Sequence, residues 1–331
     1  MAPLEKKSWH ALITGGAGFI GSHLARELLD AGAQVSVIDD LSTGKVANIS
    51  PFIPNPRFRF EQASILESEI LDSMAAEATH IFHLAAAVGV QLVVEDPLHT
   101  IETNISGTES VLKAAVSRKI PVLMASTSEV YGKSEKIPFS EDDDVLLGST
   151  QKTRWSYAAS KMLDEFLGLA YHRQKGLPVT IFRLFNTVGP GQSAQYGMVV
   201  ARFVEQALKG EPITIYGDGQ QTRCFCDVHD AVGAILRLSE CSRAPGQVFN
   251  VGSTHEISIE DLAKTVWAEV EKKKGSAARS SLVYVPYEKA YAKGFEEIRH
   301  RKPNIQKIKE YTGWEPKIPL AKTLQSILER N

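Results

Sequence analysis

The sequence contains few cysteines, no long apolar run and almost no excess of charge of either sign. Its three cysteines, Cys224, Cys226 and Cys241, are too few and odd in number to build a disulfide framework. A reducing compartment, the cytoplasm, is therefore expected. Cys224 and Cys226 lack the two further ligands that a structural zinc needs, so we expect small apolar side chains there and no metal.

The missing apolar runs and the balanced charge exclude several classes of protein. No stretch of about 18 apolar residues occurs, so no membrane-spanning helix is expected. Residues Met1 to Trp9 lack the apolar core of a signal peptide. With 37 Lys and Arg against 39 Asp and Glu, the net charge is −2, which argues against nucleic acid or an anionic membrane as the main partner.

Short apolar runs alternate with helical patterns in the first part of the chain. Buried strands are expected at residues 9–14, 35–38, 58–60, 80–84 and 122–125, with later strands at 179–185 and 248–251. Between the first two, Ile20, Leu24 and Leu28 recur every four residues, as on one face of a helix. This repetition predicts an α/β fold, a Rossmann-type doubly wound parallel sheet with helices on both faces.

A glycine-rich turn joins the first strand to the first helical pattern. Gly15, Gly18 and Gly21 would leave the backbone N–H groups at the helix N-terminus open to the pyrophosphate of a dinucleotide. Asp39 ends the next strand, where a carboxylate can hold a ribose 2′-OH and would repel a 2′-phosphate. NAD is therefore predicted rather than NADP. The alternative, a tight turn without a ligand, fits the flanking strand and helix less well.

Tyr157 and Lys161 lie four residues apart, on one face of a predicted helix. An ammonium beside a phenol lowers its pKa, so Tyr157 could take a proton from a hydroxyl whose carbon gives hydride to nicotinamide. Such a pair can also be an ordinary solvated one. Thr127 and Glu129 favour catalysis, because they follow the strand 122–125 at the sheet edge where α/β sites form. Thr127 could bond the reacting oxygen, and Glu129 could move a proton at a neighbouring carbon.

These motifs resemble the extended short-chain dehydrogenase/reductase family of nucleotide-sugar epimerases, dehydratases and decarboxylases. The resemblance covers nearly the whole chain. It also includes His83-Leu84-Ala85-Ala86, Asn104 with Gly107-Thr108, Arg183-Leu184-Phe185-Asn186, Tyr216-Gly217-Asp218-Gly219 and Trp314-Glu315-Pro316. It implies an NAD-dependent enzyme that oxidises a sugar at C4.

The resemblance also implies the residues of the site. Catalytic roles would fall to Tyr157, Lys161, Thr127, Glu129 and Arg301. The cofactor would be held by Gly15, Gly18, Phe19, Ile20, Gly21, Asp39, Leu84, Ala85, Ala86, Tyr157 and Lys161. The nucleotide sugar would be held by Ser128, Arg154, Asn186, Arg223 and Arg301. Arg301 could otherwise be a surface residue of the basic run 299–302.

Within the family, the segment Thr127-Ser128-Glu129 with Arg154 and Arg301 is most similar to UDP-glucuronate decarboxylases, which form UDP-xylose or a UDP-4-keto-pentose. A ketone at C4 is β to the C6 carboxylate, so CO2 can leave, and an arginine suits that carboxylate. The segment Tyr157-Ala-Ala-Ser-Lys161 is commoner in other members. A 4-epimerase of UDP-glucose or UDP-glucuronate, a nucleotide-sugar 4,6-dehydratase and, remotely, a non-catalytic dinucleotide-sensing protein stay open.

The resemblance implies a division of the chain and a homodimer. Residues 1–187 would form the NAD-binding domain, with a segment of about 229–253 returning to its sheet. Residues 188–331 would form mainly a smaller, interleaved C-terminal lobe that binds the UDP-sugar. The dimer would form through helices near Thr100–Ser117 and Ser156–His172.

The polar stretch 133–154, which includes the acidic run 141–144, is expected to be a solvated loop. Gly191 and Ser64 depart from the family pattern, where arginine and a carboxylate are usual.

Overall fold

A computed structural model describes residues 8–194, 198–274, 281–290, 296 and 298–330 of the chain. Its centre is a seven-stranded sheet in the order β11-β6-β5-β4-β1-β2-β3, in which every neighbouring pair is parallel. The strands are β1 (His10–Thr14), β2 (Gln34–Ile38), β3 (Phe58–Glu61), β4 (His80–His83), β5 (Val122–Thr127), β6 (Val179–Leu184) and β11 (Val248–Val251). The predicted doubly wound sheet is confirmed, with strand bounds that differ by up to two residues.

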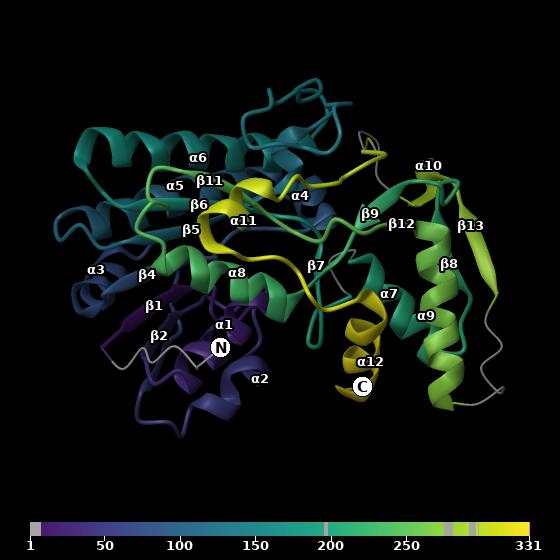
Figure 1. Cartoon of the computed structure of the whole chain (residues 1–331), viewed down its shortest axis with the longest axis horizontal. Coiled ribbons are helices and arrows are strands. Elements are labelled where there is room, and N and C mark those ends of the chain that lie inside the picture. The colour runs from purple at the N-terminus through teal and green to yellow at the C-terminus, as the bar shows by residue number, and fades with distance from the viewer. Residues whose placement is uncertain (1–7, 195–197, 275–280, 291–295, 297, 331) are drawn as a thin grey trace.

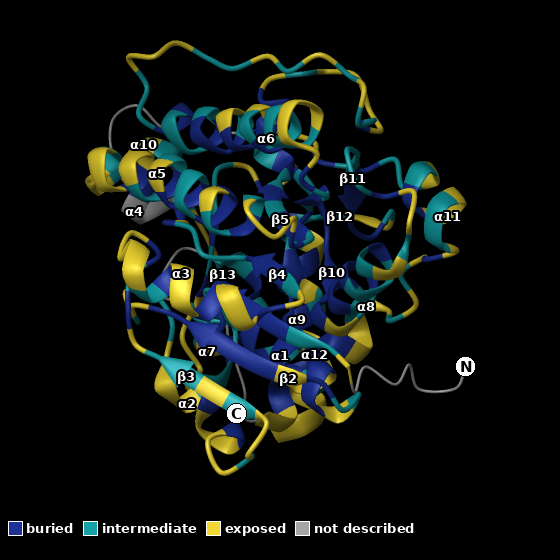
Figure 2. Cartoon of the chain, turned by 90° about the vertical axis from the view of Figure 1, so that its left-hand side faces the viewer, coloured by how far each residue is buried: buried dark blue, intermediate teal, exposed yellow. Residues whose placement is uncertain are grey.

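Helices cover both faces of the sheet (Figure 1). On one face lie α3 (Ser68–Glu77), α5 (Pro97–Val116) and α6 (Trp155–Lys175), and on the other lie α1 (Phe19–Asp30) and α8 (Val228–Glu240). The predicted apolar face of α1 is present, because Leu24 and Leu28 are fully buried against α8 and the sheet. Figure 2 shows α5 and α6 side by side at the edge of the molecule.

A second lobe packs beside the carboxyl ends of the strands, on the right in Figure 1. Its helices are α7 (Val199–Lys209), α9 (Ile259–Lys274) and α12 (Leu320–Arg330), which share one apolar core. Its strands pair in twos: β7 (Thr187–Val188) with β10 (Cys226–Asp227), β8 (Ile213–Tyr216) with β13 (Leu282–Val285), and β9 (Thr222–Cys224) with β12 (Glu256–Ser258). Short helices are α2 (Val46–Ile49), α4 (Val90–Glu95), α10 (Tyr287–Ala290) and α11 (Gln306–Thr312).

The chain passes between the two lobes more than once. After the second lobe has begun, α8 and β11 return to the sheet. Ile308 and Trp314 return as well, since both are buried in the core that contains α1 and α8. The assignment of residues 1–187 to cofactor binding and of residues 188–331 mainly to substrate binding stays a prediction.

The stretch 133–154 is a loop, but the expectation that it is solvated is wrong in part. Phe139 is fully buried, and its backbone pairs with the segment at Pro303. The loop therefore packs against the chain that carries Arg301.

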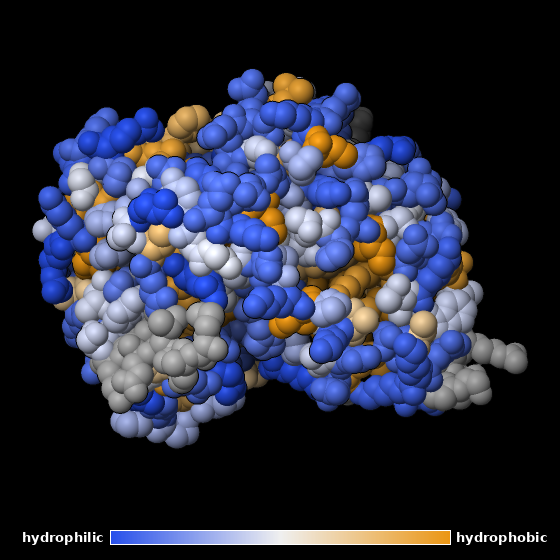
Figure 3. All heavy atoms as spheres, viewed as in Figure 1, coloured by the Kyte–Doolittle hydropathy of each residue, from blue (hydrophilic) through white to orange (hydrophobic). Residues whose placement is uncertain are grey.

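Polar side chains cover most of the face seen in Figure 3. In the part of the chain that the structure describes, no helix has the length and apolarity to cross a membrane.

Candidate active site

Two neighbouring cavities open at the carboxyl edge of the sheet, and Tyr157 and Asn186 line both. The first runs along the glycine loop and the ends of β2 and β4. All the residues that we predicted to hold the cofactor line it: Gly15, Gly18, Phe19, Ile20, Gly21, Asp39, Leu84, Ala85, Ala86, Tyr157 and Lys161. Thr127 lines it too.

The glycine loop fits a dinucleotide because its backbone is held close to the sheet. Gly15 has φ +72°, and a Cβ there would lie 2.7 Å from the backbone nitrogen of Ala85. A Cβ on Gly21 would lie 2.4 Å from the Gly15 carbonyl oxygen. Gly18 precedes the first residue of α1, and no side chain caps this helix. The first N–H groups of α1 are therefore left for an anion such as a pyrophosphate.

Asp39 stands at the end of β2, where the ribose of a dinucleotide would lie. Its two carboxylate oxygens accept hydrogen bonds from the backbone of Ala17 and Leu41, both at 2.9 Å. Burial raises the pKa of Asp39, while these two hydrogen bonds oppose the rise. The bonds fix the carboxylate in the cavity wall. There it could hold the ribose 2′-OH of NAD and would repel the 2′-phosphate of NADP.

Lys161 lies on α6, deep in the wall of the cofactor cavity. Its ammonium donates a hydrogen bond to Asp164, with Nζ 2.9 Å from Oδ2, and both side chains are almost completely buried. His83 of β4 is also buried, between the hydroxyls of Thr14 and Thr108. Burial, with Lys161 nearby, lowers the pKa of His83 to about 3, so His83 is neutral.

Tyr157 differs from our expectation in its proton affinity. We expected the ammonium of Lys161 to lower its pKa, but the pKa of Tyr157 is raised above its ordinary value. Burial is the largest cause, and the negative charges of Glu129 and Asp164 add to it. A hydrogen bond with Thr127 and the charge of Arg301 act in the opposite direction. The neutral phenol is therefore the resting form.

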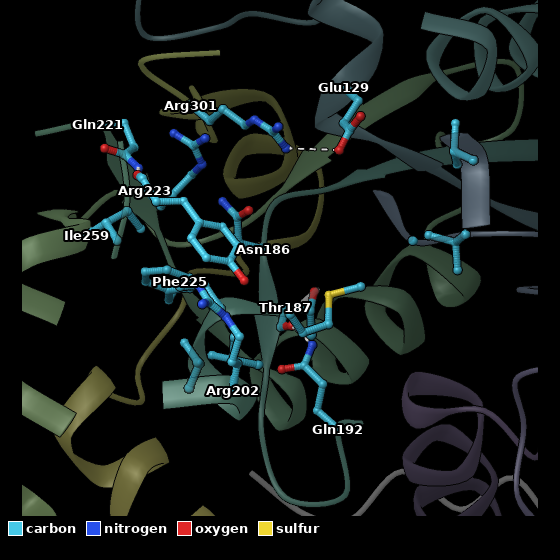
Figure 4. A pocket seen from close by; sticks show the side chains of 18 of the residues that line it. Glu129, Asn186, Thr187, Gln192, Arg202, Gln221, Arg223, Phe225, Ile259 and Arg301 are labelled. Atoms are coloured by element: carbon cyan, nitrogen blue, oxygen red, sulfur yellow. Dashed lines mark hydrogen bonds and ion pairs between the residues drawn. The ribbon is translucent and has the colours of Figure 1, made fainter. Parts of the chain in front are cut away.

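The second cavity lies between the sheet edge and the second lobe, and Figure 4 shows its side chains. The carboxylate of Glu129 points toward Arg301, with Oε1 3.2 Å from Nη1. Arg154 approaches it from the start of α6, with Nη2 3.8 Å from Oε2. Burial alone would raise the pKa of Glu129, but the charges of Arg301, Arg154 and Arg223 hold it below its ordinary value.

The structure brings most of the predicted substrate residues together. Arg154, Asn186, Arg223 and Arg301 line the second cavity, and each of the three arginines is at most 8% exposed. The surface alternative for Arg301 is thus wrong. Ser128 was also predicted to contact the sugar nucleotide, but it is 2% exposed and lines neither cavity.

Sequence reasoning missed several lining residues of the second lobe. These are Gln192, Met198, Arg202, Gln221, Phe225 and Ile259. The guanidinium of Arg202 lies over the ring of Tyr216, 3.9 Å from its centroid. Gln221 and Phe225 belong to the same stretch as Tyr216 and Arg223, which the family resemblance had marked. Arg202 had no such signal, because it lies on an ordinary amphipathic helix.

Comparisons with known proteins find relatives that match almost the whole chain. A family model described as GDP-mannose 4,6 dehydratase matches residues 12–327. A UDP-N-acetyl-alpha-D-glucosaminuronate decarboxylase of Bacillus cytotoxicus is 43% identical over 96% of each chain. UDP-glucuronic acid decarboxylase 2 of Arabidopsis thaliana is 35% identical over 97% of this chain and 68% of its own length.

Solved structures have the same fold. The UDP-glucuronic acid 4-epimerase of Bacillus cereus, solved in complex with UDP-glucuronic acid and NAD, superposes with a TM-score of 0.85. It shares 29% sequence identity with this chain, and the match covers 97% of this chain and 98% of that chain.

Proposed function

We propose that the chain decarboxylates a UDP-linked hexuronate. It belongs to the family described by the GDP-mannose 4,6-dehydratase model, the NAD-dependent short-chain dehydrogenase/reductase enzymes that act on nucleotide sugars. The substrate is UDP-glucuronate or its 2-acetamido form, on which the relatives named above act. The product is UDP-xylose or a UDP-4-keto-pentose, or the 2-acetamido counterpart.

One observation carries the proposal: the charge of the second cavity. Among its lining residues in the described part of the chain there are four arginines, Arg154, Arg202, Arg223 and Arg301, but a single carboxylate, Glu129. The two phosphate groups of a nucleotide sugar and Glu129 together neutralise three of the four. The cations of the cavity then still exceed the anions by one. Arg301 keeps a buried Nε with no hydrogen-bond partner in the described part of the chain, which favours a further anion on the substrate. A carboxylate at C6 supplies it.

The side chains at the sheet edge account for the reaction. Bound NAD would supply the hydride acceptor for C4 of the sugar and the donor for its later reduction. Tyr157 takes the proton of the 4-hydroxyl, with Thr127 beside it to hold the oxygen. Lys161 lies in the wall of the cofactor cavity, where it can bind the nicotinamide ribose.

The ketone at C4 then accepts the electron pair of the C5–C6 bond as CO2 leaves. Thr127 and Tyr157 hydrogen-bond the resulting enolate oxygen. C5 takes up one proton from solvent, which Glu129, a carboxylate at rest, binds and passes on. A product that is reduced again at C4 is the pentose, and one released before that reduction is the 4-keto sugar.

Mass spectrometry separates this reaction from the alternatives. The purified protein is incubated with NAD and, in parallel, with UDP-glucuronate, its 2-acetamido form, UDP-glucose and dTDP-glucose. We expect loss of CO2 from the uronates, with a 13C label at C6 released as CO2. A product of unchanged mass and inverted C4 would establish an epimerase instead. Loss of water would establish a dehydratase, and retention of C6 in every product would overturn the proposal.

We also propose a homodimer formed through α5 and α6. These adjacent helices expose large apolar side chains to solvent: Leu98 and Ile101 on α5, and Leu163 and Phe166 on α6. Such a patch on a pair of neighbouring helices fits the same two helices of a second copy. We also propose a cytoplasmic location, which the low cysteine content favours.

A further inference from the structure

A buried carboxylate that the proposed reaction does not use lies beside the predicted ribose-binding lysine. Asp164 is fully buried on α6, one turn after Lys161, and its Oδ2 lies 2.9 Å from the lysine Nζ. Lys161 is only 2% exposed, so water does not screen the pair. At this distance and burial, the carboxylate cancels most of the field that the ammonium would exert on its surroundings.

The other charged groups around this pair are already balanced. Glu165, the next residue of α6, forms two hydrogen bonds with Arg183, at 2.7 and 2.9 Å. From β4, His83 faces Lys161 as a neutral ring. From α5, Thr108 faces Asp164 and carries no charge. Asp164 is therefore the carboxylate that acts on Lys161 in this part of the structure.

The same pair acts on the predicted base. Tyr157 lies one turn before Lys161 on α6, and it faces Glu129 and Arg301 from the other side. The charge of Asp164 raises the pKa of Tyr157 together with burial, the larger cause, and with Glu129. Lys161 alone would act in the opposite direction.

We propose that Asp164 is a positioning residue that neutralises Lys161 and thereby sets the proton affinity of Tyr157. By cancelling the field of Lys161, it makes Tyr157 hold its proton more tightly than it would beside the ammonium alone. The inference rests on the proposed function, in which Tyr157 is the base. Its central test does not need turnover, because the ionisation of Tyr157 can be followed in the free protein.

The direct test is Asp164→Asn, which removes the charge and keeps the shape of the side chain. Tyrosine labelled with 13C at Cζ is titrated by NMR, and the Tyr157 resonance is assigned with Tyr157→Phe. We expect the pKa of Tyr157 to fall by about one unit or more, because Lys161 is then unopposed. The acidic limb of the pH–kcat profile shifts in the same direction.

A matched control is Glu269→Gln on α9. Glu269 is also buried and also pairs with a lysine three residues away, Lys272, at 2.6 Å. It lines neither cavity, so its removal should leave the Tyr157 titration unchanged. An Asp164→Asn protein that is folded but titrates at Tyr157 like the wild type would overturn the proposal.

A second variant covers the case in which Asp164→Asn does not fold because Lys161 is left without its partner. In Lys161→Met combined with Asp164→Asn, both charges are gone, and such replacements of buried pairs are often tolerated. If Asp164 neutralises Lys161, Tyr157 titrates in this double variant as in the wild type. A higher pKa of Tyr157 would show that the field of Lys161 was never cancelled. Loss of CO2 is measured separately, so failure of the decarboxylase proposal would be seen independently.

Discussion

At the scale of single residues, the site depends on which arginines are buried. Arg299 and Arg301 belong to the same basic run, yet the Arg299 side chain is 71% exposed and the Arg301 side chain 10%. The sequence marked Arg301 only through its family resemblance, because burial depends on a contact with Glu129, 172 residues away. The sequence also did not reveal that Asp164 and Lys161 form a buried pair, because burial depends on contacts with distant parts of the chain. Spacing places both on one helix, but it does not show that the pair is shielded from water.

Arg301 should recognise the carboxylate of the substrate. In Arg301→Gln, we expect UDP-glucuronate to bind at least about tenfold more weakly, since a hydrogen bond to a charged group contributes about 1.5–3 kcal/mol. UDP should bind as before, because it lacks the C6 carboxylate. Isothermal titration calorimetry measures both affinities. The control is Arg299→Gln, two residues away in the same run. Equal weakening for UDP and UDP-glucuronate would contradict the assignment.

Glu129 should make stability depend on pH in a defined way. Its pKa in the folded protein is below the ordinary value of 4.5, because the arginine charges outweigh burial. A carboxyl group with a lowered folded pKa stabilises the protein above its unfolded pKa, and this contribution is lost as the pH falls through the folded value.

The variant Glu129→Gln lacks this titration. We expect it to be less stable than the wild type at neutral pH, because it leaves Arg301 and Arg154 without their carboxylate. The difference in Tm between the two proteins should shrink as the pH is lowered below 4.5. Thermal unfolding in a pH series measures it. A difference that stays constant down to the acid limit would contradict this account.

At the scale of elements, the sheet was predictable and the packing of the loops was not. Strands buried on both faces are short apolar runs, and for this reason the bounds of β11 agree with the expected 248–251. The acidic stretch 141–144 suggested a solvated loop. Yet Glu141 accepts a hydrogen bond from the backbone of Asn250 at 2.8 Å. That partner is 109 residues away, and local composition does not reveal it.

Asn250 of β11 should hold the chain that carries Arg301. Its side-chain amide donates to the carbonyls of Phe139 and Asn304, and its oxygen accepts from Tyr131. The variant Asn250→Ala leaves these buried groups unpaired, so we expect a loss of about 1–3 kcal/mol of unfolding free energy or more. Urea denaturation measures it. Because Arg301 precedes Asn304 by three residues, UDP-glucuronate binding should weaken more than UDP binding.

The comparison for this element is Tyr131→Phe, which removes the hydroxyl that donates to Asn250 but leaves the Asn250 side chain in place. It should cost less stability than Asn250→Ala, and it should leave the ratio of the two affinities unchanged. Equal effects of the two variants on that ratio would show that Asn250 does not act on Arg301.

At the scale of the whole molecule, the proposed reaction would use side chains of both lobes. The cofactor cavity belongs mainly to the sheet, while the substrate cavity also takes side chains from α7, β8, β9 and α9. Tyr157 and Asn186 stand where the two cavities meet. The sequence led us to expect a second, interleaved lobe, because a strand at 248–251 returns late to the sheet. It did not predict that Ile308 and Trp314 also return to the first core, because they follow no strand pattern.

The dimer gives a prediction at the same scale. Phe166 is 60% exposed at the centre of α6, and Leu98 of α5 is 64% exposed. If the two helices meet their copies in a second chain, Phe166→Glu places a charge in an apolar interface and should yield a monomer. Light scattering coupled to gel filtration measures the mass of each form. The control is Ile53→Glu, at a position that is 54% exposed after α2, which should leave the dimer intact. A wild-type monomer, or a Phe166→Glu dimer, would show that this apolar face does not join two copies.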